Sequence, residues 1–262
     1  MVVSCLATYL VRVKELEISP VENEAALLLK SENSAFLVIA DLHIGIESEY
    51  REMGLNIPSQ TKVLLSKIQF LCKKYKPSSI IILGDIKHNI PFPSKSEKRD
   101  LKRFLEKLFE YVNEVIIVKG NHDGDIEKFA PPGTKIFSSK GKVIENIGLA
   151  HGHSWPSEKI MNSEKIIVAH IHPNIVLKDR LGYTFFEPCW LKGKIDIRKT
   201  CVRYKTLVKS PEILFMPAFN PLCGGKGVNK EGIVGPIGKI VDINSIDVYL
   251  LDGTLLGKLS KI

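Results

Sequence analysis

Short apolar runs of strand length recur over residues 36–169, and the segments between the first three of them have helical periodicity. The runs, which predict buried strands, are residues 36–40, 80–83, 115–118, 147–150 and 166–169. The apolar positions with helical spacing are Leu64, Leu65, Ile68, Leu71, Cys72 and Tyr75, then Leu101, Leu105, Leu108 and Val112. Ser59 is the expected cap of the first helix and Pro77 its stop, and Ser94 or Ser96 caps the second. This pattern predicts a βαβαβ order.

The second half of the chain has a different pattern. After about residue 130 helical periodicity fades, and short strand-like runs separated by Gly, Pro and Asn take over. The clearest are residues 183–186, 200–208, 212–215 and 246–251. No repeat or linker divides the sequence. We therefore expect a single mixed α/β domain over residues 1–262, with a motif-bearing core at about 34–190 and a strand-rich completion at 191–262.

The histidines of the chain, seven in all, follow the carboxyl ends of the five predicted strands. The polar residues after the strands are, in turn, Asp41 and His43; Asp85 and His88; Asn121, His122 and Asp123; His151 and His153; His170 and His172. In an α/β sheet, loops that leave the carboxyl ends of neighbouring strands converge on one edge, where ligands bind. We therefore expect the five clusters to share one site.

The residue types in these clusters indicate a metal site. Imidazole, carboxylate and amide ligands without a thiolate suit divalent ions such as Mn, Fe, Co, Ni or Zn. Residues two apart in an extended segment project to the same side, so Asp41 with His43, and His170 with His172, each present two ligands together. The set is too large for one ion, whereas two ions about 3.5–4 Å apart, joined by a carboxylate and a hydroxide, would use all of it. The surplus positive charge of such a centre suits a phosphate ester.

Five motifs in sequence order carry a family resemblance. They are Asp41-x-His43, Gly84-Asp85-x-x-His88, Gly120-Asn121-His122-Asp123, His151-Gly152-His153 and Ala169-His170-x-His172. This series resembles the signature of the calcineurin-like metallophosphoesterases, and residues 84–88 and 216–221 resemble the archaeal SbcD-related members. The motifs span about residues 34–173, and the later match reaches Gly225. The resemblance implies a four-layer αββα sandwich with two central mixed β-sheets.

The resemblance also implies which residues hold the metal ions. Each ion receives three ligands of its own, and one carboxylate bridges both. The implied ligands are Asp41, His43 and His172 for one ion, Asn121, His151 and His170 for the other, and Asp85 as the bridge. The cofactors implied are two divalent metal ions, with Mn expected first and Fe, Zn, Ni or Co as alternatives.

The implied catalytic residues lie beside this ligand set. His122 matches the family's general acid, with Asp123 accepting its other ring proton, and His88 matches a histidine near the scissile phosphate. Ala169 stands where the family has glycine, a small departure. His153 has no general ligand role in the family, so we expect it behind the ligands. The alternative for His122 is a residue that orients the substrate, and for His88 and His153 a polar residue packed behind the site.

The function implied is a binuclear metal-dependent phosphoesterase. We expect a phosphodiesterase in which a metal-bridging hydroxide attacks phosphorus in line and His122 protonates the departing alkoxide. Nucleic acid and nucleotides are the candidate substrates. A phosphomonoesterase on the same scaffold is the alternative, and a nucleic-acid-binding or protein-binding module with a vestigial metal site is a third hypothesis. No protein partner is indicated.

Composition limits the class of protein, its partners and its compartment. The sequence is 44% hydrophobic and 25% charged, which excludes disorder and fibrous repeats, and a net charge of +8 favours anionic partners. Five cysteines with no CxxC pair indicate a reducing compartment. Residues 1–10 are apolar but lack a basic leader, and Arg12 and Lys14 follow too soon for a signal peptide. No uncharged stretch reaches the ~20 residues of a membrane span, so we expect no membrane partner and a cytoplasmic protein.

Three further segments have competing interpretations. Residues 192–209 are rich in lysine and arginine, and from Val202 to Lys209 apolar and basic residues alternate, which predicts a strand. This strand could form a groove wall for a polyanion. We favour the alternative, an edge strand that its lysines protect from pairing with other chains. Glu47 and Glu49 are expected on a solvated helix face. The glycine-rich residues 224–227 and 235–239 lack phosphate-loop spacing and are expected to be loops or turns.

Overall fold

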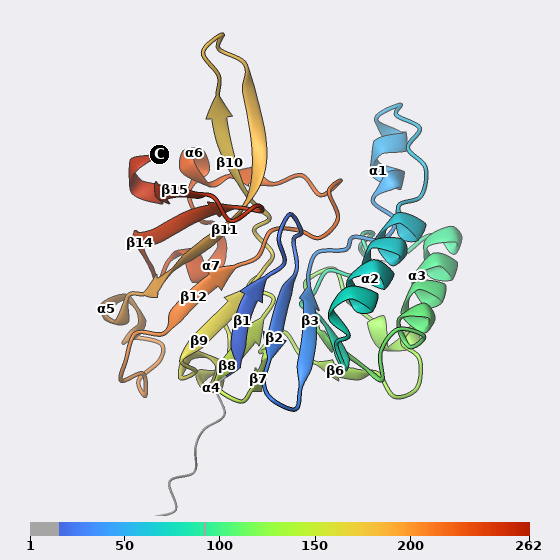
Figure 1. The fold of residues 1–262 in the computed structure, drawn as a ribbon, viewed down its shortest axis with the longest axis horizontal. Coiled ribbons are helices and arrows are strands. Elements are labelled where there is room, and N and C mark those ends of the chain that lie inside the picture. The colour runs from blue at the N-terminus through green and yellow to red at the C-terminus, as the bar shows by residue number, and fades with distance from the viewer. Residues whose placement is uncertain (1–15, 92) are drawn as a thin grey trace, which may run out of the picture.

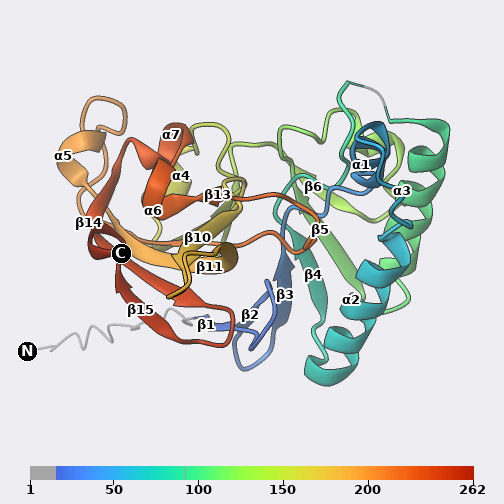
Figure 2. The same ribbon diagram turned by 90° about the horizontal axis from the view of Figure 1, so that it is seen from above.

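The computed structural model describes residues 16–91 and 93–262, and it has two β-sheets packed face to face with helices on both outer sides (Figure 1). Seen from above, the larger helices lie at one side of the molecule and several short helices at the other, with the strands between them (Figure 2). The expected four-layer arrangement of helices, sheet, sheet and helices is confirmed. The segment at residues 1–10 lies outside the described residues.

The first sheet contains the predicted βαβαβ unit. Its strands, in spatial order, are β1 (Glu17–Pro20), β2 (Leu27–Lys30), β3 (Ala35–Ile39), β4 (Ser79–Ile82), β5 (Glu114–Val118) and β6 (Lys135–Phe137). The strands from β3 to β6 are parallel, whereas β1 and β2 are antiparallel additions that the sequence pattern did not predict. The helices of this half are α1 (Glu47–Glu52), α2 (Thr61–Tyr75), α3 (Lys95–Leu108) and the short η1 (Ile126–Lys128).

The two long helices begin and end close to where the sequence predicts. Ser94 caps α3 in a capping box, because its hydroxyl accepts the N–H of Glu97 at 3.2 Å and the Glu97 carboxylate accepts the N–H of Ser94 at 3.3 Å. The residue before α2 is Gln60 rather than Ser59, so the predicted cap is off by one position. The helix stops at Lys76, which is in the left-handed region directly before Pro77.

The second sheet is built by the strand-rich remainder. Its strands are β7 (Lys142–Ile144), β8 (Ile147–Ala150), β9 (Lys165–Val168), β10 (Pro173–Lys178), β11 (Thr184–Ile195), β12 (Glu212–Phe215), β13 (Lys226–Gly227), β14 (Val241–Leu250) and β15 (Leu255–Lys258). The order is β13-β10-β11-β12-β9-β8-β7, with β14 between β11 and β15. Its helices are α4 (Glu158–Met161), α5 (Ile197–Thr200), α6 (Val228–Glu231), α7 (Gly235–Gly238) and η2 (Leu259–Lys261).

Alternating residues of each central strand separate the interior into three apolar layers. In β4, Ile80 and Ile82 pack toward α2 and α3, whereas Ile81 faces the second sheet. In β9, Ile167 faces the first sheet, and Ile166 packs toward the outer helices of the second. The middle layer therefore contains side chains from both sheets, as period-two strands buried on both faces require.

The basic segment is not a strand, which corrects the sequence-based expectation. β11 ends at Ile195, α5 follows, and residues 201–208 form turns. Val202 and Val208 are 88% and 87% exposed, whereas Tyr204 is buried and donates its hydroxyl to the Pro156 carbonyl at 2.9 Å. Residues 201–208 therefore do not form the expected strand, so the segment is not a guarded edge strand.

Two smaller expectations also need correction. Glu47 is only 4% exposed because its carboxylate accepts the N–H of Gln60 at the start of α2, while Glu49 is half-exposed as expected. In the glycine-rich segments, residues 226 and 227 pair with β10 as β13, and residues 235–238 form α7. None of the helices in the described part of the chain has the length and apolar character needed to cross a bilayer.

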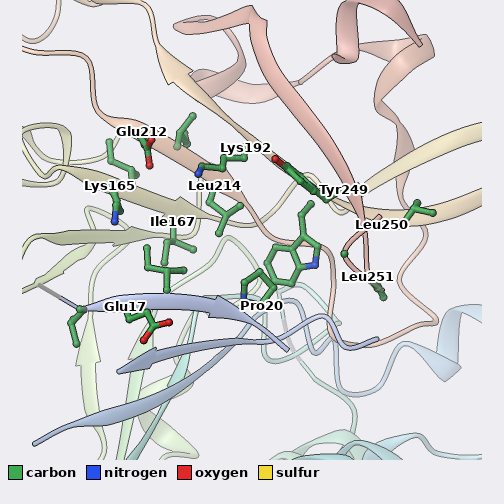
Figure 3. Close-up of a pocket in the computed structure, with 16 residues that line it drawn as sticks. Glu17, Pro20, Lys165, Ile167, Lys192, Glu212, Leu214, Tyr249, Leu250 and Leu251 are labelled. Atoms are coloured by element: carbon green, nitrogen blue, oxygen red, sulfur yellow. The ribbon is translucent and has the colours of Figure 1, made fainter. Parts of the chain in front are cut away.

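A cavity of about 560 Å³ lies between β1 and the second sheet (Figure 3). Its walls are mostly apolar and include Ile18, Leu214 and Tyr249, with four charged side chains among them. Lys165 and Glu212, at the amino ends of β9 and β12, are two of these. The cavity is thus at the opposite end of β9 from the loop that contains the predicted histidines.

Candidate metal centre

The polar clusters meet where the parallel strands of both sheets end. Backbone hydrogen bonds extend the strand pairing into the loops: the His43 N–H donates to the Asp85 carbonyl, and the Ala169 N–H donates to the His151 carbonyl, both at 2.9 Å. The Phe219 N–H donates to the carbonyl of Ala40 at 2.9 Å, so the loop after β12 joins the same edge. Loops from both sheets therefore hold the side chains in one place, as the sequence analysis predicts.

The backbone of the site is strained. Non-glycine residues with positive φ are uncommon, and each costs of order 1–3 kcal/mol. The site residues in this conformation are Asp41 (φ 54°), His43 (φ 41°), Asp85 (φ 50°), His170 (φ 72°) and His172 (φ 41°). The hydrogen bonds between loops hold this conformation, which turns the side chains out of the strand direction.

Asp85 is at the centre of the cluster. Its Oδ2 lies 3.1 Å from Nε2 of His151 and 3.7 Å from Nε2 of His43, while its Oδ1 accepts the N–H of His122 at 2.8 Å. Burial alone would raise the pKa of Asp85, but contact with His151 outweighs burial and holds that pKa well below its usual value. A side chain at Gly120 would overlap the Asp85 carboxylate, so this close approach requires glycine.

Two histidines have their ring orientation fixed by backbone carbonyls. Nδ1 of His151 lies 2.8 Å from the Leu83 carbonyl, and Nδ1 of His172 lies 2.9 Å from the Gly224 carbonyl. Each Nδ1 therefore donates a proton, which leaves Nε2 as the atom that can bind a cation. Nε2 of His172 lies 3.3 Å from Oδ1 of Asp41.

The charge of His151 follows from its surroundings. Burial disfavours the protonated ring, but Asp85 and Asp41 outweigh burial and raise the pKa of His151 to about 9. The pKa of His172 is also raised, because Asp41 outweighs burial there too. Burial instead lowers the pKa of His43 to about 3 and that of His170 to about 4. The centre thus combines histidines that hold a proton with histidines that are ready ligands.

Unpaired polar atoms test whether cations fit here. Buried polar atoms are normally hydrogen-bonded, and each exception needs a physical reason. Four buried atoms of the cluster make no hydrogen bond of normal geometry among the described residues, and each lies only 3.1–3.7 Å from another candidate ligand atom: Asp41 Oδ1, His43 Nε2, His151 Nε2 and His172 Nε2. The ligand atoms fall into groups that lie within 4.8 Å of one another, including Asp41–His43–Asp85 and Asp85–His151–His170. This donor set fits divalent cations on two sides of Asp85.

The predicted catalytic histidines adjoin this centre. Nδ1 of His88 lies 3.3 Å from Nδ1 of His43, and Nε2 of His88 lies 3.1 Å from Oε2 of Glu49. Nδ1 of His122 contacts the carbonyl oxygen of His88. His43, His88 and His122 thus form one group of three rings at the edge of the site.

Asp123 differs from its predicted role. It is buried and accepts the N–H of Ile86 and of Gly120, both at 2.8 Å, while the His88 carbonyl takes the position opposite Nδ1 of His122. Asp123 therefore ties the loops after β4 and β5 together rather than orienting the His122 ring. The physical reason is that its carboxylate faces two backbone donors left free by the turn.

Two further predicted residues are Asn121 and His153. Asn121 is exposed in the loop beside His122. The ring of His153 lies 5.2 Å from that of His151 and 5.9 Å from that of His170, and its buried Nδ1 has no hydrogen-bond partner among the described residues. His153 is therefore beside the centre, behind His151.

Two residues of the site were missed by the sequence analysis. Sγ of Cys223 lies within 4.8 Å of ring nitrogens of His43 and His172, and burial raises the pKa of the thiol. Glu97 is buried, and its carboxylate accepts the N–H of His88 at 3.2 Å. For Cys223 the signal was the family resemblance that begins at residue 216 and reaches Gly225, and for Glu97 it was its spacing of three residues from the cap Ser94. Neither signal predicts a contact with the histidines.

The fold and this site together define a metallophosphoesterase. The chain belongs to the calcineurin-like phosphoesterase family, whose sequence pattern matches residues 34–205. It is therefore a hydrolase that acts on phosphoester bonds, in a family that uses divalent metals.

Solved structures agree with the fold. The nuclease MPE of Pseudomonas putida is 20% identical, with 90% of this chain and 98% of that chain covered, and has a TM-score of 0.53. The phosphoesterase Yfce of E. coli is 14% identical, with 85% and 96% covered and a TM-score of 0.41. The first comparison shows a shared fold. No curated protein sequence matches this chain closely enough to count as a relative.

Proposed function

We propose that the chain is a binuclear metal-dependent phosphodiesterase. The observation that carries the proposal is the set of four buried, unpaired ligand atoms arranged around Asp85. In this proposal Asp85 is shared by both ions. The other ligands are Asp41, His43 and His172 on one side, and Asn121, His151 and His170 on the other.

A backbone carbonyl orients one histidine on each side of the proposed centre. Two divalent ions, when bound, polarise the phosphoryl oxygens and lower the pKa of a coordinated water toward about 7. The carbonyls of Leu83 and Gly224 hold His151 and His172 with Nε2 available to the ions. His151 must lose its extra proton for this, because a ligand imidazole is neutral.

His122 is the proposed general acid. Its Nδ1 contacts the His88 carbonyl, which orients the ring and leaves the other ring nitrogen to hold the proton that the departing alkoxide takes. His88 is proposed to position the substrate, with Glu49 against its Nε2. In this account Asp123 keeps the His122 loop in register through its two backbone hydrogen bonds.

Nucleic acid or a nucleotide is the proposed substrate class. The net charge of +8 attracts a polyanion, and the Pseudomonas putida protein of the same fold is described as a nuclease. We propose Mn as the ion that supports hydrolysis, because the carboxylate and amide oxygens of the predicted set suit Mn, with Fe, Zn, Ni or Co as alternatives that suit its imidazoles.

The test compares a chromogenic phosphodiester with the matching monoester on protein loaded with Mn. Faster diester hydrolysis, abolished by chelator and strongly reduced in His122→Ala, is the expected result. Faster monoester hydrolysis would assign the chain to the phosphomonoesterases. If neither ester is hydrolysed by any divalent ion, the catalytic proposal is wrong.

A further inference from the structure

Cys223 lies at the metal centre although it belongs to none of the five motifs. It is in the loop between β12 and β13, which is fixed to the first sheet by the side-chain amide of Asn220 donating to the Leu42 carbonyl at 2.8 Å. The N–H of Cys223 donates to the Asn220 carbonyl at 3.0 Å, so the cysteine is held by the same anchor. Its position is therefore set by the docking of this loop, and the side chain is only partly exposed.

The thiol lies beside two of the candidate cation ligands. Sγ lies within 4.8 Å of ring nitrogens of both His43 and His172, and 3.4 Å from the carbonyl oxygen of Asp41. The next residue, Gly224, supplies the carbonyl that fixes His172. The thiol and the His172 ring are thus placed by adjacent residues of one loop.

Independent observations indicate that a cation fits beside the thiol. Asp41 is fully buried and His43 is 5% exposed, yet Asp41 Oδ1 and His43 Nε2 make no hydrogen bond among the described residues. Among the described cysteines, Cys72 and Cys189 are buried in apolar layers and Cys201 is exposed beyond α5, so Cys223 alone is near the histidines.

We propose that Cys223 is an additional ligand of the cation held by Asp41, His43 and His172, and that it biases this position toward thiophilic ions such as Zn²⁺, Co²⁺ or Fe²⁺ over Mn²⁺. The inference rests on the proposed metal centre. On binding, the S–H bond breaks, the proton goes to solvent, and sulfur donates an electron pair to the ion. Thiolate is a softer ligand than imidazole or carboxylate, which is why it shifts the preference.

The experiment titrates chelator-treated full-length protein with Co²⁺ and records the near-ultraviolet sulfur-to-cobalt charge-transfer band. We expect the band in the wild type and in Cys201→Ser, and its loss in Cys223→Ser. Cobalt content is measured on the same samples. In competition with Mn²⁺, Cys223→Ser should lower the preference for Zn²⁺ by about tenfold or more.

The outcomes separate this inference from the proposed function. Bound cobalt without a charge-transfer band in the wild type would overturn the role of Cys223 and leave the metal centre intact. No retained cobalt would overturn both. A second measurement on wild-type protein does not depend on how the variant folds: Zn²⁺ should slow alkylation of Cys223 by about tenfold or more while Cys201 reacts at an unchanged rate. Equal alkylation of Cys223 with and without bound Zn²⁺ would contradict the proposal.

Discussion

The metal centre and the cavity shown in Figure 3 lie at opposite ends of β9, and they differ in what occupies the space between the sheets. At the carboxyl end, His170 and His172 leave the strand and join charged, strained residues. At the amino end, Lys165 and Glu212 border a space whose walls are mainly apolar. In an α/β sheet ligands bind at the carboxyl ends of the strands, so the polar side chains gather there, whereas strand side chains line the cavity.

Unpaired polar atoms differ between the two ends in the same way. Four ligand atoms at the metal centre make no hydrogen bond among the described residues, whereas at the cavity the indole Nε1 of Trp190 is the unpaired atom. Only the first group has the charge and geometry to hold cations. The comparison predicts that changes at the two ends have effects of very different size.

The largest effect is expected from Asp85→Asn. The amide keeps the volume but removes the charge that His43 and His151 face, so metal content and ester hydrolysis should both fall, hydrolysis by more than the ~10–100-fold typical of residues behind the ligands. Metal analysis and kinetics on the same preparation measure this, with Asp252→Asn at the surface as the control. Full metal content in Asp85→Asn would contradict the central place of this carboxylate.

A smaller effect is expected from Glu97→Ala, which removes the Glu97 half of the capping box of α3 and the acceptor for the N–H groups of His88 and Asn89. Loss of these bonds should cost about 2 kcal/mol, or ~30-fold in the folding equilibrium. Urea unfolding of metal-free protein measures it. Glu106→Ala on the exposed side of the same helix is the matched control and should change stability by less than ~0.5 kcal/mol. Equal effects would show that the His88 loop does not depend on Glu97.

The pH dependence of metal binding should be about tenfold per pH unit for each proton displaced. The pKa of His151 is raised from 6.5 to about 9, so below pH 9 a cation must displace its proton, and affinity should rise between pH 6.5 and 9. In metal-free protein the sign is opposite: the stability that protonated His151 contributes is complete below pH 6.5 and is lost as pH rises through 9. Calorimetry in two buffers of different ionisation enthalpy counts the protons. Binding without proton release at pH 7 would contradict this assignment.

The smallest effect is expected at the cavity. Trp190→Phe removes an N–H group that has no hydrogen-bond partner among the described residues, but it also removes part of a buried side chain, so stability should fall by about 1 kcal/mol while hydrolysis should not change. Denaturant midpoints and kinetics measure both. A marked loss of hydrolysis would show that the two ends of β9 are coupled.

Local patterns predicted the central strands β3, β4 and β5 of the first sheet because these strands are largely buried, and they predicted its long helices because those have their own signals. The Ser94 cap, for example, depends on a residue only three positions away. Local sequence patterns could not predict contacts between distant segments. Cys223 is 182 positions from Asp41 in the sequence. Asp123 was expected to contact the His122 ring but accepts two backbone N–H groups instead. The segment around Tyr204 has strand-like alternation, yet a single hydrogen bond to Pro156 makes it a turn.

The ligand atoms come from both halves of the sandwich: Asp41, His43 and Asp85 follow strands of the first sheet, and His151 and His172 follow strands of the second. A bound ion would therefore link the two sheets directly, in addition to the apolar layer and the loop hydrogen bonds that already join them. An ion at a hundredfold excess over its dissociation constant would add about 2.7 kcal/mol to the stability of the joined state.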